Sequence, residues 1–148
     1  MGGGPRAAWD HVAPILTAIA ADYDGIACAT WMGQGGAGHF VKTVHNGIEY
    51  ADMQMIAEVY GILRDSAGWD APRIGRLFEG WQKGPLSSYL IEVSAAALQT
   101  TDPETGQAMV DVILDRAGQK GTGRWTIIEA LKMGQSANTI EAAVGARG

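Results

Sequence analysis

Residues 38–67 read GHFVKTVHNGIEYADMQMIAEVYGILRDSA and form the longest helical pattern in the chain. Val41, Val44 and Ile48 recur at helical spacing on a side away from the charged residues, as in an amphipathic helix. Gly68 follows the pattern, and glycine is the residue that most often ends a helix. The stretch therefore predicts one long helix with an apolar side that can face a core.

The rest of the chain predicts further helices and almost no strand. Alternation with a period of two, which is typical of a half-buried strand, is nearly absent. Asp70 and Ser87 are residue types that cap helices, and each precedes a helical pattern. We predict an all-α chain of about six or seven helices. Other helical patterns cover 7–22, 70–81, 87–98, 126–133 and 139–147, with a short apolar segment at 109–114. The tryptophans predicted to be packing residues, and not platforms for a ligand, are Trp9, Trp69, Trp81 and Trp125.

Length and composition limit the classes of protein that the chain can belong to. Its 148 residues suit one domain, so we predict a single helical domain over residues 1–148. A net charge of −5 excludes a generally basic surface for nucleic acid. One cysteine, Cys28, excludes an internal disulfide framework. No apolar stretch of about 20 residues is present, so we expect a cytoplasmic protein without a membrane segment.

A polar group of side chains lies along the predicted long helix. At about 100° per residue, His45, Asn46 and Glu49 fall within roughly 60° of Lys42, and Tyr50 lies beside them. A solvated helix face is one interpretation, although Lys42 and Glu49 do not have the usual i,i+4 spacing of a surface ion pair. A metal site on His45 and Glu49 is a weaker one because a third ligand is lacking. A functional site on these polar side chains is the third interpretation.

The second candidate site is a glycine-rich turn at residues 118–123, GQKGTG. Its backbone amides, with Lys120 and Thr122 as additional donors, suit an anion such as a phosphate. The turn is not a P-loop, because Arg124 stands where that motif requires lysine. A plain turn with a solvated lysine is the alternative. Arg147 is either a further anion ligand or a charge favoured at a helix C-terminus.

Several longer motifs follow one another along the chain. They are GGAGHFVK at 35–42, VHNGIEY at 44–50, LSSYLIE at 86–92, ILDRAGQKGTGRWT at 113–126 and EAAVGAR at 141–147. In this order they resemble the 6-phosphogluconate dehydrogenases, the decarboxylating oxidoreductases of the pentose phosphate pathway. The resemblance covers nearly the whole chain and implies the fold of the first half of that family's C-terminal helical domain.

The resemblance implies a role for each candidate residue. Lys42 would be the general base that takes the proton from the substrate 3-hydroxyl while hydride leaves C3 for NADP. The 3-keto acid would lose CO2, and Glu49 would protonate C1 of the enediol to give ribulose 5-phosphate. These roles predict a buried Lys42 and a shielded Glu49. His45 and Asn46 would contact the sugar acid, and the ligands mainly of its phosphate would be Tyr50, Lys120, Thr122 and Arg147.

The resemblance also implies what this chain lacks. The family begins with an α/β domain bearing G-x-G-x-x-G, and residues 33–38 follow no clear strand pattern. We therefore expect a truncated chain without the nucleotide-binding domain that mainly holds NADP, without a metal, and with little activity alone. The complete enzyme would be a homodimer. The alternatives are a non-catalytic binding or oligomerisation module and the helical domain of a related 3-hydroxyacid dehydrogenase.

Overall fold

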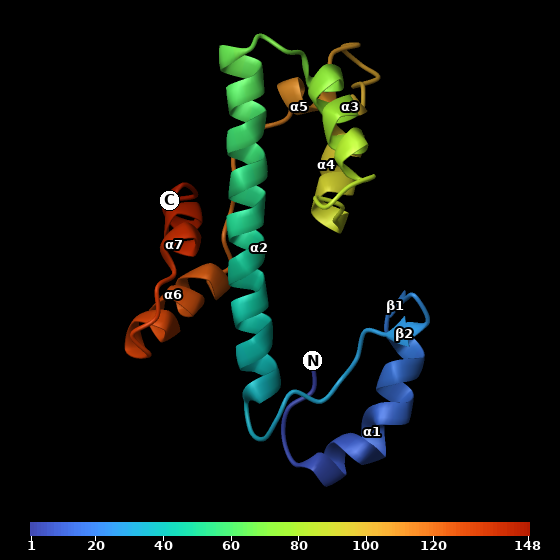
Figure 1. The fold of residues 1–148 in the computed structure, drawn as a ribbon, viewed down its shortest axis with the longest axis vertical. Helices are drawn as coiled ribbons and strands as arrows, with labels where there is room; N and C mark the ends of the chain where they lie inside the picture. The colour runs from blue at the N-terminus through green and yellow to red at the C-terminus, as the bar shows by residue number, and fades with distance from the viewer. The chain divides into compact units, whose positions relative to one another are not determined.

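The computed structural model describes all residues from Met1 to Gly148, and most of them are helical (Figure 1). The seven α-helices are α1 (Arg6–Ile19), α2 (Ala37–Gly61), α3 (Ala71–Trp81), α4 (Tyr89–Gln99), α5 (Met109–Val112), α6 (Thr122–Lys132) and α7 (Asn138–Gly145). A π-helical turn, η1 (Ile62–Ser66), follows α2, and the strands β1 (Asp22–Tyr23) and β2 (Ile26–Ala27) form a small antiparallel hairpin. The all-α prediction is confirmed apart from this hairpin. None of the helices is both long enough and apolar enough to cross a membrane.

The chain forms two compact units, which are described separately. Unit 1 comprises Met1–Glu49 and Lys120–Glu141, and unit 2 comprises Tyr50–Gln119 and Ala142–Gly148. Helix α2 contributes residues to both. The expectation of one domain over residues 1–148 stays a prediction.

In unit 1, the glycine-rich loop at residues 30–38 is packed against the N-terminal residues. The Gly2 amide donates to Thr30 O at 2.8 Å, and the Met32 amide donates to Gly2 O at 2.8 Å. A Cβ added to Gly38, at the start of α2, would lie 2.6 Å from Met1 O, which is closer than a side chain can approach. Glycine is therefore needed at position 38 because the backbone of the N-terminal residues fills the space beside it.

In unit 2, α3 and α4 pack together to form the main apolar core. Asp70 caps α3 as predicted, since its carboxylate accepts from the Arg73 amide at 2.8 Å. Gly75 allows the close approach of α4, because a Cβ there would lie 3.0 Å from Ala95 O. Phe78 is fully buried. The buried residues of this core are Ala71, Ile74, Phe78, Ile91, Ala95 and Leu98.

Three local predictions were wrong in detail. Ser88, and not Ser87, caps α4, because the Ser88 hydroxyl accepts from the Ile91 amide at 3.2 Å. The last-but-one helix begins at Thr122 and not at Thr126, since Gly121 has a φ of 99° and starts it. Trp125 is 51% exposed, although it was predicted to pack. It lies one residue, or about 100°, from the α6 position that faces α2, and so points elsewhere.

Candidate active site

The four predicted polar residues of α2 meet around one atom, Nδ1 of His45. Lys42 Nζ lies 3.3 Å from this nitrogen, Asn46 Oδ1 lies 3.4 Å from it and Glu49 Oε2 lies 3.3 Å from it. A neutral imidazole can accept from Lys42 through Nδ1, whereas a protonated Nδ1 donates to Glu49 or Asn46. His45 therefore touches both residues predicted to carry the acid–base chemistry.

These side chains are more exposed than the sequence predicted. Lys42 is exposed, and the side chains of His45 and Glu49 are 43% and 42% exposed. The expectation of a buried Lys42 and a shielded Glu49 is wrong for this chain. The reason lies in the helix geometry, because Thr43 and Gly47 occupy the positions that face α6. The polar residues are thereby turned toward solvent.

The second glycine turn leads directly into α6. Gly121 adopts a left-handed conformation, Lys120 precedes it and Thr122 is the first residue of the helix. No side chain caps this helix, so its first amides are not satisfied by a capping oxygen. Free amides at the N-terminus of an 11-residue helix favour negative charge, and a lysine adjoins them.

One contact in unit 1 connects this turn to the polar residues of α2. Thr126 is 5% exposed, and its Oγ1 lies 2.8 Å from Thr43 O and 2.9 Å from Thr122 O. A Cβ added to Gly47 would lie 2.6 Å from Thr126 Oγ1 and 2.9 Å from both other side-chain carbons. Sequence reasoning missed Thr126. The available signal was Gly47 itself, which is costly inside a helix unless a close contact requires it.

This close contact makes position 47 sensitive to added volume. We expect Gly47→Ala to lower the free energy of unfolding by about 1–2 kcal/mol, because the overpacking exceeds the gain in helix propensity. Thermal or urea unfolding followed by circular dichroism measures the change. Gly61→Ala is the matched control, since its helical φ of −58° and the nearest atom at 4.0 Å leave room for a methyl group. That control should gain about 0.5–1 kcal/mol. A Gly47→Ala variant as stable as the control would contradict the contact.

In unit 2, two further predicted residues contact each other. The Arg147 guanidinium lies 4.2 Å from the centre of the Tyr50 ring, which is buried. Arg147 Nη1 also donates to Gly118 O at 3.3 Å, and Nη2 lies 3.9 Å from Met53 Sδ. A guanidinium has five N–H donors in a fixed fork. Arg147 is therefore held in place while it keeps donors that an anion can use.

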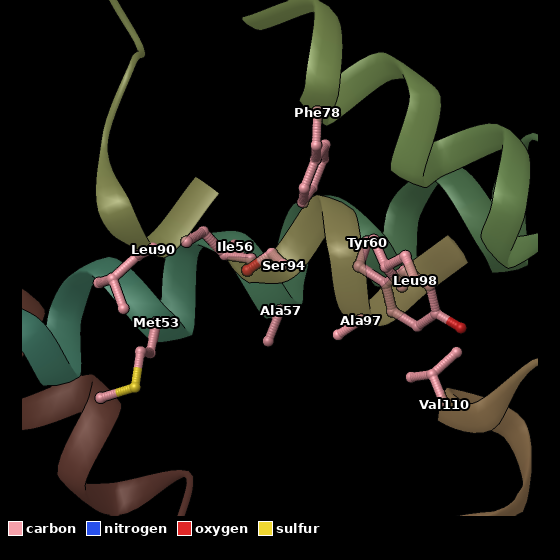
Figure 2. Close-up of a pocket in the computed structure, with 10 residues that line it drawn as sticks. All are labelled: Met53, Ile56, Ala57, Tyr60, Phe78, Leu90, Ser94, Ala97, Leu98 and Val110. Atoms are coloured by element: carbon pink, nitrogen blue, oxygen red, sulfur yellow. The ribbon is translucent and has the colours of Figure 1, made fainter. Parts of the chain in front are cut away.

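An apolar pocket of about 270 Å³ opens in unit 2, and it contains none of the predicted site residues (Figure 2). Its polar groups are the hydroxyls of Ser94 and Tyr60, and the latter lies 3.5 Å from Asp111 Oδ1. Partial burial raises the pKa of Tyr60 above its usual value. The pocket is lined by Met53, Ile56, Ala57, Tyr60, Phe78, Leu90, Ser94, Ala97, Leu98 and Val110. Such a lining offers no acid–base pair, so the chemistry is assigned to α2.

Comparison with known proteins decides the family. Residues 38–148 match a family model described as "6-phosphogluconate dehydrogenase, C-terminal domain". The chain belongs to the 6-phosphogluconate dehydrogenase family. The resemblance found in the sequence is thus confirmed.

Relatives in this family come from several organisms, and some are named as NADP-dependent and others as NAD-dependent. The decarboxylating 6-phosphogluconate dehydrogenase of Synechocystis is 52% identical, and so is the NADP-dependent decarboxylating enzyme of Bacillus subtilis. The NAD-dependent decarboxylating enzyme of Bacillus subtilis is 49% identical. Each match covers 99% of this chain and 31% of the relative, so the chain spans about a third of the length of these 6-phosphogluconate dehydrogenases.

A solved structure confirms the fold at the level of the family. Plasmodium falciparum 6-phosphogluconate dehydrogenase superimposes with a TM-score of 0.91 at 44% identity, over 98% of this chain and 31% of that one. That protein is described in its apo form, with NADP+ and with its substrate 6-phosphogluconate. The chain thus has the fold of part of the 6-phosphogluconate dehydrogenase helical domain.

Proposed function

We propose that this chain supplies the substrate-binding and acid–base residues of a decarboxylating 6-phosphogluconate dehydrogenase. The reaction would convert 6-phosphogluconate to ribulose 5-phosphate and CO2. The observation that carries the proposal is the convergence of Lys42, Asn46 and Glu49 on His45 Nδ1. The family membership supports it, because the relatives are named as decarboxylating enzymes.

The first chemical role belongs to Lys42, which takes the proton of the 3-hydroxyl at Nζ. A base must be neutral, so Lys42 has to lose a proton before the substrate reacts. His45 Nδ1 is 3.3 Å away and can accept that proton when it is unprotonated. The same nitrogen contacts Glu49 Oε2 at 3.3 Å. After CO2 leaves, Glu49 gives a proton to C1.

Substrate recognition is divided between the sugar acid and its phosphate. His45 and Asn46 orient the sugar acid through the imidazole and the carboxamide, which are both donors and acceptors. Lys120, Thr122, Tyr50 and Arg147 are the proposed phosphate ligands, and charge-assisted bonds from lysine and arginine suit a dianion.

The hydride that leaves C3 needs an acceptor. The Bacillus subtilis relative is named as NADP-dependent, so we propose NADP as this acceptor. The glycine stretch at 33–38 does not have the setting of a dinucleotide-binding motif, because the strands before it form only the short antiparallel hairpin of β1 and β2, whereas that motif follows a strand of a parallel sheet. We therefore assign no step of the reaction in this chain to a nucleotide-binding residue. The proposed location is the cytoplasm.

A second function, association with another protein surface, is favoured by α1. This helix buries no residue, and Ile15 and Ile19 on it are exposed. Exposed apolar patches mark interaction surfaces. The partner that we propose for this surface is a second copy of the chain, which would give a homodimer. If the chain functions only by associating with another protein surface, it should bind no sugar phosphate.

Calorimetric titration of the chain with 6-phosphogluconate tests the proposed function. We expect binding, and at least about tenfold weaker binding of gluconate, which lacks the phosphate. Lys120→Ala should reduce the affinity for 6-phosphogluconate toward that for gluconate. Lys83→Ala is the matched control, because Lys83 is an exposed lysine in the turn after α3, and it should leave both affinities unchanged. Equal affinity for the two ligands, or no binding of either, would refute the assignment.

A further inference from the structure

Thr126 stands out because it is a buried polar side chain in a chain whose other polar groups are mostly exposed. It is 5% exposed, and its Oγ1 has two acceptors, Thr43 O on α2 and Thr122 O on α6. A hydroxyl has one hydrogen to donate, so the two carbonyls share it or compete for it. Burying a hydroxyl is favourable only when such bonds are made.

The two carbonyl oxygens that accept from Thr126 belong to the two parts of the candidate site in unit 1, which are the polar residues of α2 and the glycine turn at 118–123. Thr43 adjoins Lys42, and its carbonyl lies in the helical turn that leads to Gly47. Thr122 belongs to the glycine turn at 118–123, is the first residue of α6 and is itself a proposed phosphate ligand. A shift of the hydroxyl would therefore move the polar residues of α2 relative to the turn that begins α6.

Gly47 sets how near the two helices come. Three atoms of the Thr126 side chain lie where a Cβ of residue 47 would be, at 2.6, 2.9 and 2.9 Å. Real Cβ atoms do not approach other atoms so closely, so any larger residue at position 47 would push the two helices apart or bend one of them. The distance between α2 and α6 is thus fixed by Gly47 on one helix and by Thr126 on the other, whose hydroxyl lies within hydrogen-bond distance of two carbonyl oxygens.

We propose that Thr126 is a positioning residue that sets the spacing between the acid–base residues of α2 and the Lys120–Thr122 turn. Through this spacing it selects ligands by length. A ligand with a carboxylate end and a phosphate end must reach both groups at once, whereas inorganic phosphate needs the turn alone. This inference rests on the proposed function, because it takes the turn as the phosphate site.

The experiment compares two ligands on three forms of the chain. Thr126→Val keeps the shape of the side chain and removes both hydrogen bonds, and Thr126→Ser keeps the hydroxyl. We expect Thr126→Val to weaken 6-phosphogluconate binding about tenfold and inorganic phosphate binding less than about twofold. Thr126→Ser should bind both ligands within about twofold of the wild type. Parallel weakening of both ligands, or no weakening of either, would overturn the inference, since lost folding reduces both together.

A second measurement keeps the two hypotheses distinguishable. If the wild-type chain binds neither ligand, the proposed function fails, and nuclear magnetic resonance then decides the positioning role alone. In Thr126→Val, the chemical shifts of the backbone amides should change both in residues 42–49 and in residues 120–123. In Thr126→Ser, these chemical shifts should stay as in the wild type. Shifts confined to α6 would overturn the inference. If Thr126→Val does not fold, as judged by circular dichroism, the same two measurements are made on Thr126→Ala, with the same expected results.

Discussion

Replacing Lys42 with methionine is expected to slow 6-phosphogluconate oxidation by about 100- to 10,000-fold, the usual contribution of a general base. Methionine has a similar length but no nitrogen that can take the proton of the 3-hydroxyl. The affinity for 6-phosphogluconate should change far less, because the proposed phosphate ligands are untouched. A large loss in turnover with a small loss in binding is the signature of an interaction that acts on the reaction and not on ground-state binding.

The rate can be measured as NADP reduction by a hybrid enzyme. In this hybrid the chain replaces the matching 31% of the NADP-dependent relative from Bacillus subtilis, to which it is 52% identical. Lys132→Met is the matched control, since this exposed lysine at the end of α6 pairs with Glu129 and has no proposed role. The control should retain the rate of the unsubstituted hybrid. Turnover by Lys42→Met at the control rate would remove Lys42 from the mechanism.

Replacing Phe78 with alanine is expected to lower the free energy of unfolding by about 3–5 kcal/mol. Phe78 has no exposed surface, belongs to the α3–α4 core of unit 2 and stacks on Trp81 with ring centres 4.7 Å apart. The substitution removes the ring, leaves a cavity and removes the stacking partner of Trp81. Tyr50 and Arg147 also belong to unit 2, so the contact between them should weaken when the core of this unit is destabilised.

Urea unfolding followed by tryptophan fluorescence and circular dichroism measures this loss. Tyr89→Ala is the matched control, because Tyr89 is an aromatic residue in α4 of the same unit and is 75% exposed. We expect it to change stability by less than about 0.5 kcal/mol. Equal effects of the two substitutions would mean that the α3–α4 core contributes no more to stability than the surface.

Local features of the fold were predictable from short stretches of sequence. The cap at Asp70 needs only the residues around it, and the long helix follows from the spacing of its apolar residues. The grouping of Lys42, His45, Asn46 and Glu49 was predictable for the same reason, since side chains three and four apart in a helix share a face.

Features that depend on distant parts of the chain were not predictable from spacing. The contact of Thr126 with Gly47 and that of Arg147 with Tyr50 join residues far apart in sequence, so no local pattern encodes them. The exposure of Lys42 follows from the side of α2 that α6 covers, which periodicity does not identify. Trp125 was mispredicted for a related reason: its size favours burial, yet position 126 is the one that faces α2.

A crystal structure of the chain with 6-phosphogluconate would show whether one ligand bridges the polar residues of α2 and the glycine turn at 118–123. We expect the 3-hydroxyl within hydrogen-bond distance of Lys42 Nζ and the phosphate against Lys120 and Thr122. A ligand bound away from Lys42, or with its phosphate at the proposed acid–base residues, would rule out this arrangement.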